Sequence, residues 1–148
     1  MIELKVKKLH PDAIIPTYAT DGAACFDLHV VDVGDQHPLY YQNGHVFRTG
    51  LSFEVPQGYA LMIYSRSGHG FKHGARLSNC VGVIDSDYRG EVMVKLYADI
   101  STNDPLRVSS GDRIAQAMVI ELPTVSLEEV DELGDTVRGT GGFGSTGL

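Results

Sequence analysis

The chain is built from short segments with a period-two apolar pattern, each ended by glycine, proline or polar turn residues. Thr49–Pro56 and Tyr59–Tyr64 each predict a strand, and Pro56-Gln57-Gly58 joins them. Val92–Tyr97 alternates in the same way, and residues 2–9 predict a first strand. Since a period of two is typical of strands, these segments predict an all-β fold.

The composition is that of a globular protein: the 148 residues suit one domain, and 43% are hydrophobic and 21% charged. The formal net charge is −7 without a Lys/Arg block, so a nucleic acid polymer is not expected as a partner. A nucleotide stays possible if a few arginines and backbone amides converge, with a divalent cation screening the other charges.

Neither a signal-peptide core nor an apolar run long enough to span a bilayer occurs in the sequence. We therefore expect a cytoplasmic protein without a membrane partner. Cys25 and Cys80 form no CxxC pair, and we expect reduced, buried thiols rather than metal ligands.

The stretch Gly82–Glu91 is a candidate site because it places carboxylates, a phenol and a guanidinium between two apolar runs. A fixed carboxylate can orient and deprotonate water, and an aromatic ring can pack against a sugar or a base. The alternative is structural, since Asp, Ser and Gly form turns, and Arg89 with Glu91 could be a solvated strand end. With either interpretation the chain is predicted to bend here between strands.

Ser65–Gly74 interrupts the strand pattern with three glycines, two serines and two cations. Arg and Ser donors at the start of a short helical turn can hold phosphate oxygens, whereas the alternative is a flexible turn with a solvated arginine. His69 and His73 have the spacing of two metal ligands on a helix, but the glycines make a stable helix doubtful. We therefore expect no zinc site.

Three polar side chains lie within apolar segments. Asp27 lies between Phe26 and Leu28 in a predicted strand, where it either faces outward or has a functional role. Arg113 and Gln116 belong to a run that is otherwise apolar, and buried polar groups need partners. For Arg113 we expect an acidic partner, and for Gln116 a bond to the backbone is the structural alternative.

Two polar regions carry no motif of their own. Val31–Gly50 is rich in turn signals; Leu39-Tyr40-Tyr41 could pair as a strand, and His37 and His45 are predicted to be surface residues. Residues 121–136 are acidic and suggest a last strand followed by a spacer.

The C-terminal tail has five glycines in the ten residues from Arg138 to Gly147, too many for a packed core. Such a tail should be mobile unless it clamps a ligand, and its amides could wrap phosphates. A disordered terminus is the alternative, but it explains poorly a lone Phe143 with Arg138 ahead of it.

Taken in order, five segments resemble the motifs of the trimeric deoxyuridine triphosphatases and cover the chain from near its start to its end: Ala23–Val30, Arg66–Gly74, Asn79–Met93, Gly111–Gln116 and Arg138–Gly147. The resemblance implies Mg-assisted, in-line attack of water on the α-phosphorus of dUTP. The products would be dUMP and pyrophosphate, which keeps uracil out of DNA and supplies dUMP for dTMP synthesis.

The same resemblance implies an all-β, distorted jelly roll of the β-clip, dUTPase-like type in a homotrimer whose three sites each draw on all three subunits. It implies a barrel domain over residues 1–137 and a flexible, glycine-rich C-terminal arm over residues 138–148 that closes over the active site.

By similarity, Asp85 would hold and deprotonate the attacking water. Tyr88 would lie under the deoxyribose and leave no room for a 2'-hydroxyl. Gly82 would permit a tight bend. The uracil site as a whole would consist of Asn79, Gly82, Val83, Ile84 and Met93.

The resemblance places the phosphate and metal contacts in other motifs. Mg2+ would bridge the triphosphate, with Asp27 contacting it through water. The phosphate groups would be held by Arg66, Ser67, Gly68 and Gln116, and the closing arm would add Arg138, Ser145 and Thr146 on the γ-phosphate and Phe143 over the uracil.

Two positions depart from the family, which usually has glycine where Cys25 stands and often proline where Ser65 stands. The nearest alternative is a deoxycytidine triphosphate deaminase, which shares the fold but uses a glutamate to activate water for attack on the base. Asp85–Tyr88 and the arm favour the diphosphatase. A second alternative is a nucleotide-binding regulator whose tail switches toward a protein partner, a role that could coexist with catalysis.

Overall fold

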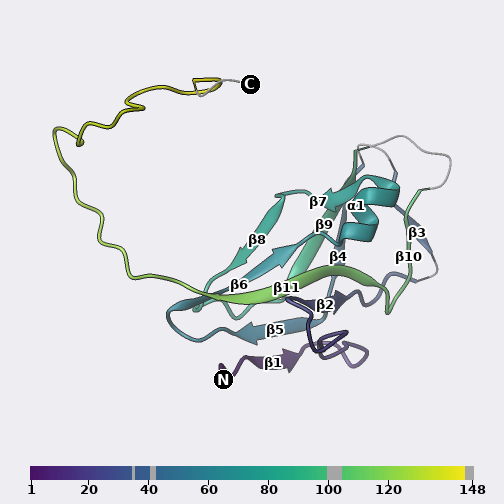
Figure 1. Ribbon diagram of the computed structural model, residues 1–148. Coiled ribbons are helices and arrows are strands. Elements are labelled where there is room, and N and C mark those ends of the chain that lie inside the picture. Colours follow the sequence, from purple (N-terminus) through teal and green to yellow (C-terminus); the bar gives the residue numbers. More distant parts are fainter. Residues whose placement is uncertain (35, 41–42, 100–104, 146–148) are drawn as a thin grey trace.

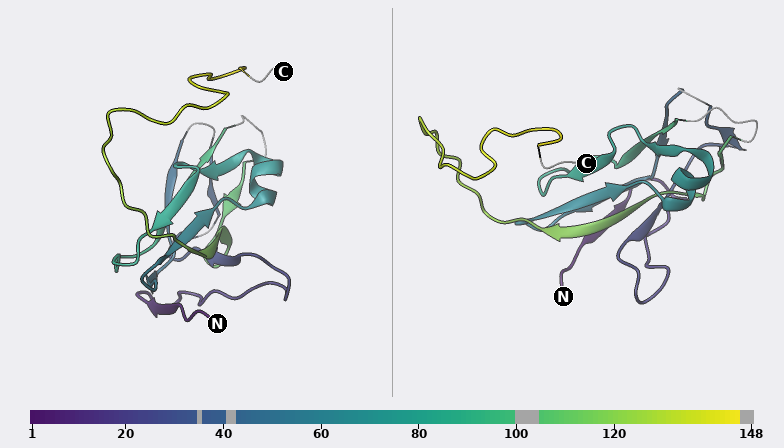
Figure 2. Two further views of the ribbon diagram at one scale, coloured as in Figure 1. Left: turned by 60° about the vertical axis from the view of Figure 1, so that its left-hand side comes forward. Right: turned by 45° about the horizontal axis from the view of Figure 1, so that its top comes forward.

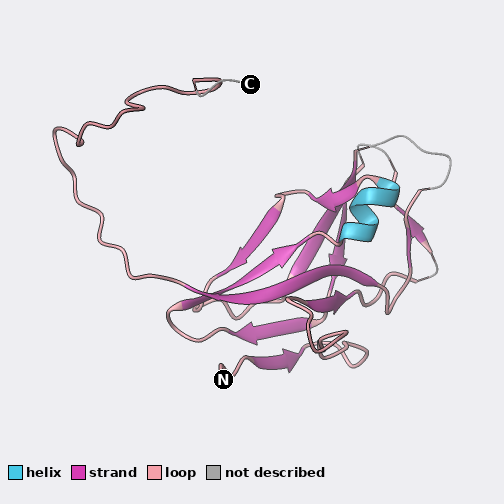
Figure 3. Cartoon of the chain, viewed as in Figure 1, coloured by secondary structure: helices cyan, strands magenta, loops and turns pink. Residues whose placement is uncertain are grey.

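The computed structural model describes residues 1–34, 36–40, 43–99 and 105–145, and its regular structure is almost entirely β (Figures 1 and 3). The predicted all-β class is confirmed. The elements are β1 (Lys5–Lys8), β2 (Phe26–His29), β3 (His37–Pro38), β4 (His45–Arg48), β5 (Leu51–Glu54), β6 (Tyr59–Tyr64), α1 (Ser67–His73), β7 (Ala75–Leu77), β8 (Val81–Ile84), β9 (Met93–Ala98), β10 (Arg107–Val108) and β11 (Arg113–Glu121).

The strands form two main antiparallel sheets and two short ribbons. One sheet has the order β2-β11-β6-β8 and the other the order β4-β9-β7, while β1 pairs with β5 and β10 with β3. On β11, Gln116 lies between Asp27 of β2 and Tyr64 of β6. β11 therefore places segments that are far apart in the sequence side by side (Figure 1).

Period-two alternation determines which side chains form the core. In β9, Val94 and Leu96 are buried while Met93 and Lys95 are exposed. Both main sheets contribute to one continuous apolar cluster, which includes Leu28, Phe47, Leu61, Ile63, Val94, Leu96, Ile114 and Ala117. The sheets thus share one core, as expected for the predicted jelly roll.

The predicted strands differ from the observed ones mainly in length and pairing. The first strand is Lys5–Lys8 rather than residues 2–9, and β5 and β6 belong to different sheets although a three-residue turn was predicted to join them. The residues that pair near position 39 are His37 and Pro38, whereas Leu39 and Tyr40 lie outside a strand; Tyr41 is outside the described residues.

The helix observed at Ser67–His73 corrects the sequence analysis, in which the glycines of this segment made a stable helix doubtful. Gly74 ends α1 in the left-handed region at φ 60°, and its N–H donates to the Gly70 carbonyl oxygen at 3.0 Å. Glycine adopts that conformation without strain, so the same residue type that weakens the helix interior also terminates it. The histidines His69 and His73 do lie on this helix, but no group of three or more metal-ligating side chains occurs among the described residues.

The chain leaves the body after Glu121, the last residue of β11, and residues 122–145 run outward as an extended segment (Figures 1 and 2). The predicted last strand beyond Glu121 is wrong. Leu127, Leu133 and Val137 are fully or almost fully exposed, because within the described part of this chain no strand pairs with the segment. The last observed strand therefore ends at Glu121, and the barrel domain over residues 1–137 stays a prediction.

His37 and His45 are not free surface residues as predicted. Both are half-buried, and their rings stack with centroids 3.7 Å apart, next to Phe47. Cys80 is exposed rather than buried, and Cys25 is partly buried. No helix in the described ranges is long and apolar enough to cross a membrane.

Candidate functional site

The predicted nucleoside residues gather along β8 and the start of β9. A pocket of about 240 Å³ is lined by Val83, Ile84, Asp85, Tyr88 and Met93 together with Glu91 and Val92. A neighbouring pocket of about 250 Å³ shares Val83, Ile84 and Met93 and adds Asn79 and Gly82. The structure thus brings together seven of the eight residues that the sequence assigned to the base, sugar and attacking water; the eighth, Phe143, lies on the arm.

Asp85 lies immediately after β8, at the start of a turn closed by the Tyr88 N–H, which donates to the Asp85 carbonyl oxygen at 3.2 Å. Its carboxylate is exposed at the pocket. A carboxylate in this position can accept a proton from a water molecule at the pocket entrance.

Tyr88 has a defined orientation. Its hydroxyl donates to the Glu91 carbonyl oxygen at 3.1 Å, and its ring lies so close to Gly90 that a Cβ there would come within 2.5 Å of Tyr88 Cζ. Arg89 supports the turn by donating from Nη1 to the Ser86 and Tyr88 carbonyl oxygens. The ring therefore needs glycine at position 90.

Gly82 does not form the tight bend that was expected. It lies inside β8, directly opposite Ile63 of β6, and it is not among the residues with positive φ. A Cβ at this position would be 3.0 Å from Ile63 Cβ and 3.9 Å from Asn79 Nδ2. Glycine is needed here for close packing beside the pocket, not for its backbone freedom.

The predicted phosphate arginine belongs to a second cluster. Arg66 Nε donates to Asp27 Oδ1 at 3.1 Å, and Arg113 Nη1 donates to Asp27 Oδ2 at 3.2 Å. The acidic partner expected for Arg113 is thus Asp27, whose side chain is 16% exposed. The two guanidinium groups give this face a local positive charge despite the net charge of −7.

The other phosphate candidates lie next to Arg66. Ser67 and Gly68 begin α1, whose first backbone amides have no side-chain cap. Gln116 Nε2 donates to the Ser65 carbonyl oxygen at 3.0 Å, the backbone bond considered as its structural alternative. Its carboxamide therefore holds the segment that carries Arg66.

His69 is a further neighbour of Arg66 that was considered in the sequence only as a zinc ligand. Arg66 Nη1 lies 3.3 Å from His69 Nε2, which accepts when the ring is neutral. Burial, with a smaller effect of Arg66, lowers the pKa of His69 and favours that neutral form. Near the same cluster, burial and the Asp27 carboxylate raise the pKa of the Cys25 thiol, so Cys25 stays protonated.

The described residues fit a magnesium ion only in an outer role. Each oxygen of the Asp27 carboxylate already accepts from an arginine, and an oxygen cage of several carboxylates is absent from the described part of the chain. A carboxylate oxygen has further lone pairs, so Asp27 can still accept from water molecules around an ion. Most of the ion's ligands would then be water and substrate oxygens.

The arm residues lie away from both clusters in the single chain (Figure 2). Arg138 Nε donates to the Gly141 carbonyl oxygen at 2.9 Å, and Phe143 and Ser145 are exposed. Thr146 lies outside the described residues. The contacts of the arm with the triphosphate and the uracil therefore stay a prediction.

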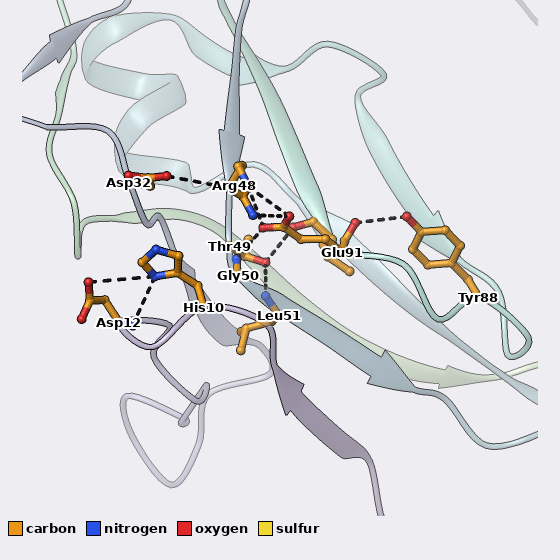
Figure 4. Close-up of polar contacts among 10 residues, drawn as sticks. His10, Asp12, Asp32, Arg48, Thr49, Gly50, Leu51, Tyr88 and Glu91 are labelled. Atoms are coloured by element: carbon orange, nitrogen blue, oxygen red, sulfur yellow. Dashed lines mark hydrogen bonds and ion pairs between the residues drawn. The ribbon is translucent and has the colours of Figure 1, made fainter.

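Two supporting side chains had no clear signal in the sequence. Glu91, considered only as a solvated strand end, has a mostly buried carboxylate that binds Arg48 and the backbone of Gly50 (Figure 4). Ser65, one of the two departures from the family, accepts from the Leu77 N–H at 3.0 Å and so connects β7 to the segment before α1. Both contacts join residues far apart in the chain, which spacing alone does not reveal.

Comparison with known proteins gives consistent matches. The sequence profile of the dUTPase family matches residues 11–147. The deoxyuridine 5'-triphosphate nucleotidohydrolase of Nautilia profundicola is 44% identical over 148 residues, covering 99% of both chains. The enzyme of the same name from Helicobacter hepaticus is 42% identical over 147 residues, covering 99% of this chain and 90% of that protein.

Among solved structures, the dUTPase of Staphylococcus bacteriophage 80alpha with dUpNHpp superposes with a TM-score of 0.84 at 25% identity, covering 100% of both chains. The structural match spans the whole chain, and the family profile extends into the arm. This chain therefore belongs to the dUTPase family.

Proposed function

We propose that this protein hydrolyses dUTP to dUMP and pyrophosphate by attack of water on the α-phosphorus. The observation that carries the proposal is the pocket in which an exposed carboxylate, Asp85, lies beside Tyr88 and the backbone of Val83 and Ile84. The relatives named deoxyuridine 5'-triphosphate nucleotidohydrolase support the same substrate.

Asp85 acts as the general base in this proposal. It accepts the proton of the attacking water through a carboxylate oxygen, and the leaving group is pyrophosphate, which departs opposite the entering oxygen. Its exposed position after β8 leaves the carboxylate accessible to water.

Base and sugar selection come from the shape of the two pockets. Asn79 and the exposed backbone edge of β8 offer donors and acceptors to the uracil edge, and Met93 supplies an apolar wall. Tyr88 lies under the sugar, where a 2'-hydroxyl would collide with its ring or lose hydrogen bonds to water.

The triphosphate is held by Arg66, Ser67, Gly68 and Gln116, the group that lies at the start of α1 and on β11. Mg2+, when bound, neutralises part of the phosphate charge, and Asp27 would hold it through water. Asp27 also has a task of its own, since it aligns the guanidinium groups of Arg66 and Arg113.

The functional unit in this proposal is a homotrimer in which subunits share each site. Arg66 and Asp85 lie beyond opposite ends of the β6–β8 pair, about 20 Å apart along the strand direction. No cationic side chain of the described residues lines the Asp85 pocket. Phosphate-binding groups from a neighbouring subunit would complete that pocket. An apolar groove lined by Ile2, Val6, Tyr18 and Phe26 and the exposed leucines of residues 122–137 provide surface for such an assembly.

The decisive experiment compares products and substrates. With Mg2+, the protein should release pyrophosphate from dUTP, and Asp85→Asn should keep nucleotide binding while losing about two to four decades of rate. Release of ammonia from dCTP without pyrophosphate would identify a deaminase instead, and tight dUTP binding without turnover would favour the regulator. An unchanged rate in Asp85→Asn would remove Asp85 from the mechanism.

A further inference from the structure

Glu91 is a mostly buried carboxylate beside the nucleoside pocket whose task is not explained by catalysis. Its side chain is only 15% exposed. Arg48 Nε and Nη2 both donate to Glu91 Oε2 at 3.0 Å, and the Gly50 N–H donates to Oε1 at 2.8 Å (Figure 4). A charged group taken out of water needs such partners, so the carboxylate is held in one place.

The backbone of the same residue holds Tyr88. The Tyr88 hydroxyl donates to the Glu91 carbonyl oxygen at 3.1 Å (Figure 4). The ring lies so close to Gly90 that a Cβ there would come within 2.9 Å of Cε2. The position of the ring is therefore set by the position of the Glu91 backbone. The Glu91 side chain in turn fixes that backbone against Gly50.

Bonds on both sides of Glu91 attach the same segment to residues 49–52. The Thr49 hydroxyl donates to the Val92 carbonyl oxygen at 2.6 Å, and the Ser52 hydroxyl donates to the Arg89 carbonyl oxygen at 2.7 Å. These bonds hold residues 89 and 92, and the Val92 N–H also donates to the Leu51 carbonyl oxygen at 2.8 Å. The Glu91 carboxylate adds the side-chain bonds by which residue 91 itself is attached to Arg48 and Gly50. Loss of the carboxylate should therefore loosen Tyr88 without detaching the whole turn.

Arg48 connects this support to a second loop. Its Nη1 lies 3.7 Å from Asp32 Oδ2, and Asp32 has a positive φ of 62°. The guanidinium thus lies between two carboxylates, with the shorter contacts on Glu91. This arrangement pre-organises Arg48 for a bidentate interaction with Glu91.

We propose that Glu91 is a positioning residue for substrate specificity: by fixing Tyr88 under the sugar, it maintains the preference for deoxyribose over ribose. This inference rests on the proposed function, because it assumes that Tyr88 faces the sugar. If a supporting side chain is lost and the contact residue can move by about 1 Å, selectivity is lost. The Glu91 carboxylate bonds Arg48 and Gly50 rather than Asp85, so proton transfer by Asp85 should change little.

The test measures kcat and KM for dUTP and UTP with the full-length protein, Glu91→Gln and the control Glu54→Gln. Glu54 is also a carboxylate in an ion pair, with Lys5 at 2.7 Å, but its side chain is 49% exposed and it lies outside both nucleoside pockets. We expect Glu91→Gln to reduce the ratio of kcat/KM for dUTP to that for UTP by about tenfold, with kcat for dUTP within about threefold of the original. Glu54→Gln should leave the ratio unchanged.

The outcomes separate this inference from the proposed function. If Tyr88→Ala changes the ratio but Glu91→Gln changes both substrates equally, Glu91 is only structural and the inference is overturned. If neither variant changes the ratio, the assumption about Tyr88 fails as well. Should Glu91→Gln not fold, Tyr88→Phe removes the hydroxyl bond to the Glu91 carbonyl and keeps the ring; a ratio equal to that of the original protein would then overturn the inference.

Discussion

Gly82→Ala is the most direct test of how the fold shapes the proposed uracil site. Gly82 lies opposite Ile63 in the β6–β8 pair, and the added methyl group would be 3.0 Å from Ile63 Cβ and 3.3 Å from Ile63 Cγ1. Ile63 is 3% exposed and has little room to move away. The methyl group would therefore push β8 outward or displace the pocket wall.

Two opposing effects determine the size of the stability change. Overpacking of a well-packed site costs about 1–3 kcal/mol, whereas replacing glycine by alanine at a compatible backbone position stabilises by about 0.4–1 kcal/mol through the unfolded state. Gly82 has no positive φ, so the second effect applies. We expect a net loss of about 1 kcal/mol, which lowers the Tm by about 2–4 °C for a domain of this size.

The effect on substrate binding should be larger than the effect on stability. The same methyl group would lie 3.9 Å from Asn79 Nδ2 and would take up space in the pocket that we propose for the uracil. A misplacement worth about 1.4 kcal/mol raises KM for dUTP about tenfold. Steady-state kinetics and thermal unfolding of the same samples separate the two effects.

Gly22→Ala is the matched control, because a Cβ at Gly22 meets nothing within 4 Å and its φ is not positive. It should leave KM unchanged and the Tm equal or slightly higher. An unchanged KM and an unchanged or raised Tm in Gly82→Ala would refute the packing argument, since both would show that β8 accepts a side chain at this position.

Two further predictions concern pH and the arm. Burial lowers the pKa of His29, His45 and His69 from the ordinary value of 6.5, so the unfolded chain binds protons more readily than the folded one. The free energy of unfolding should therefore fall as the pH drops below about 6.5 and level off once the folded histidines are protonated. Urea titrations at several pH values would show this fall, and His69→Gln should make the free energy of unfolding depend less steeply on pH. Truncation before Arg138 should leave a folded assembly with almost no dUTP hydrolysis, because residues 138–145 contribute nothing to the buried core; unfolding of the truncated protein would show that the arm is structural.

The period-two patterns and the chemical residue types were readable from the sequence. Val92–Tyr97 predicted a strand that is observed as Met93–Ala98, and Tyr59–Tyr64 was predicted with its observed ends. Alternation is a local property, because successive side chains of a strand point to opposite faces whatever the partner strand is. The grouping of Asp85 and Tyr88 in one stretch is local for the same reason, since only two residues separate them.

Pairing and support were decided by the tertiary structure. Three contacts depend on the register between strands that are distant in sequence: Arg113 with Asp27, Arg48 with Glu91, and Gly82 with Ile63. The helix α1 formed against its weak local propensity, whereas the apolar residues after Glu121 formed no strand within the described chain. Propensity and alternation act over a few neighbouring residues, whereas a strand or a buried charge finds its partner only when the whole chain folds. For the extended C-terminal segment, we propose that another subunit supplies this partner.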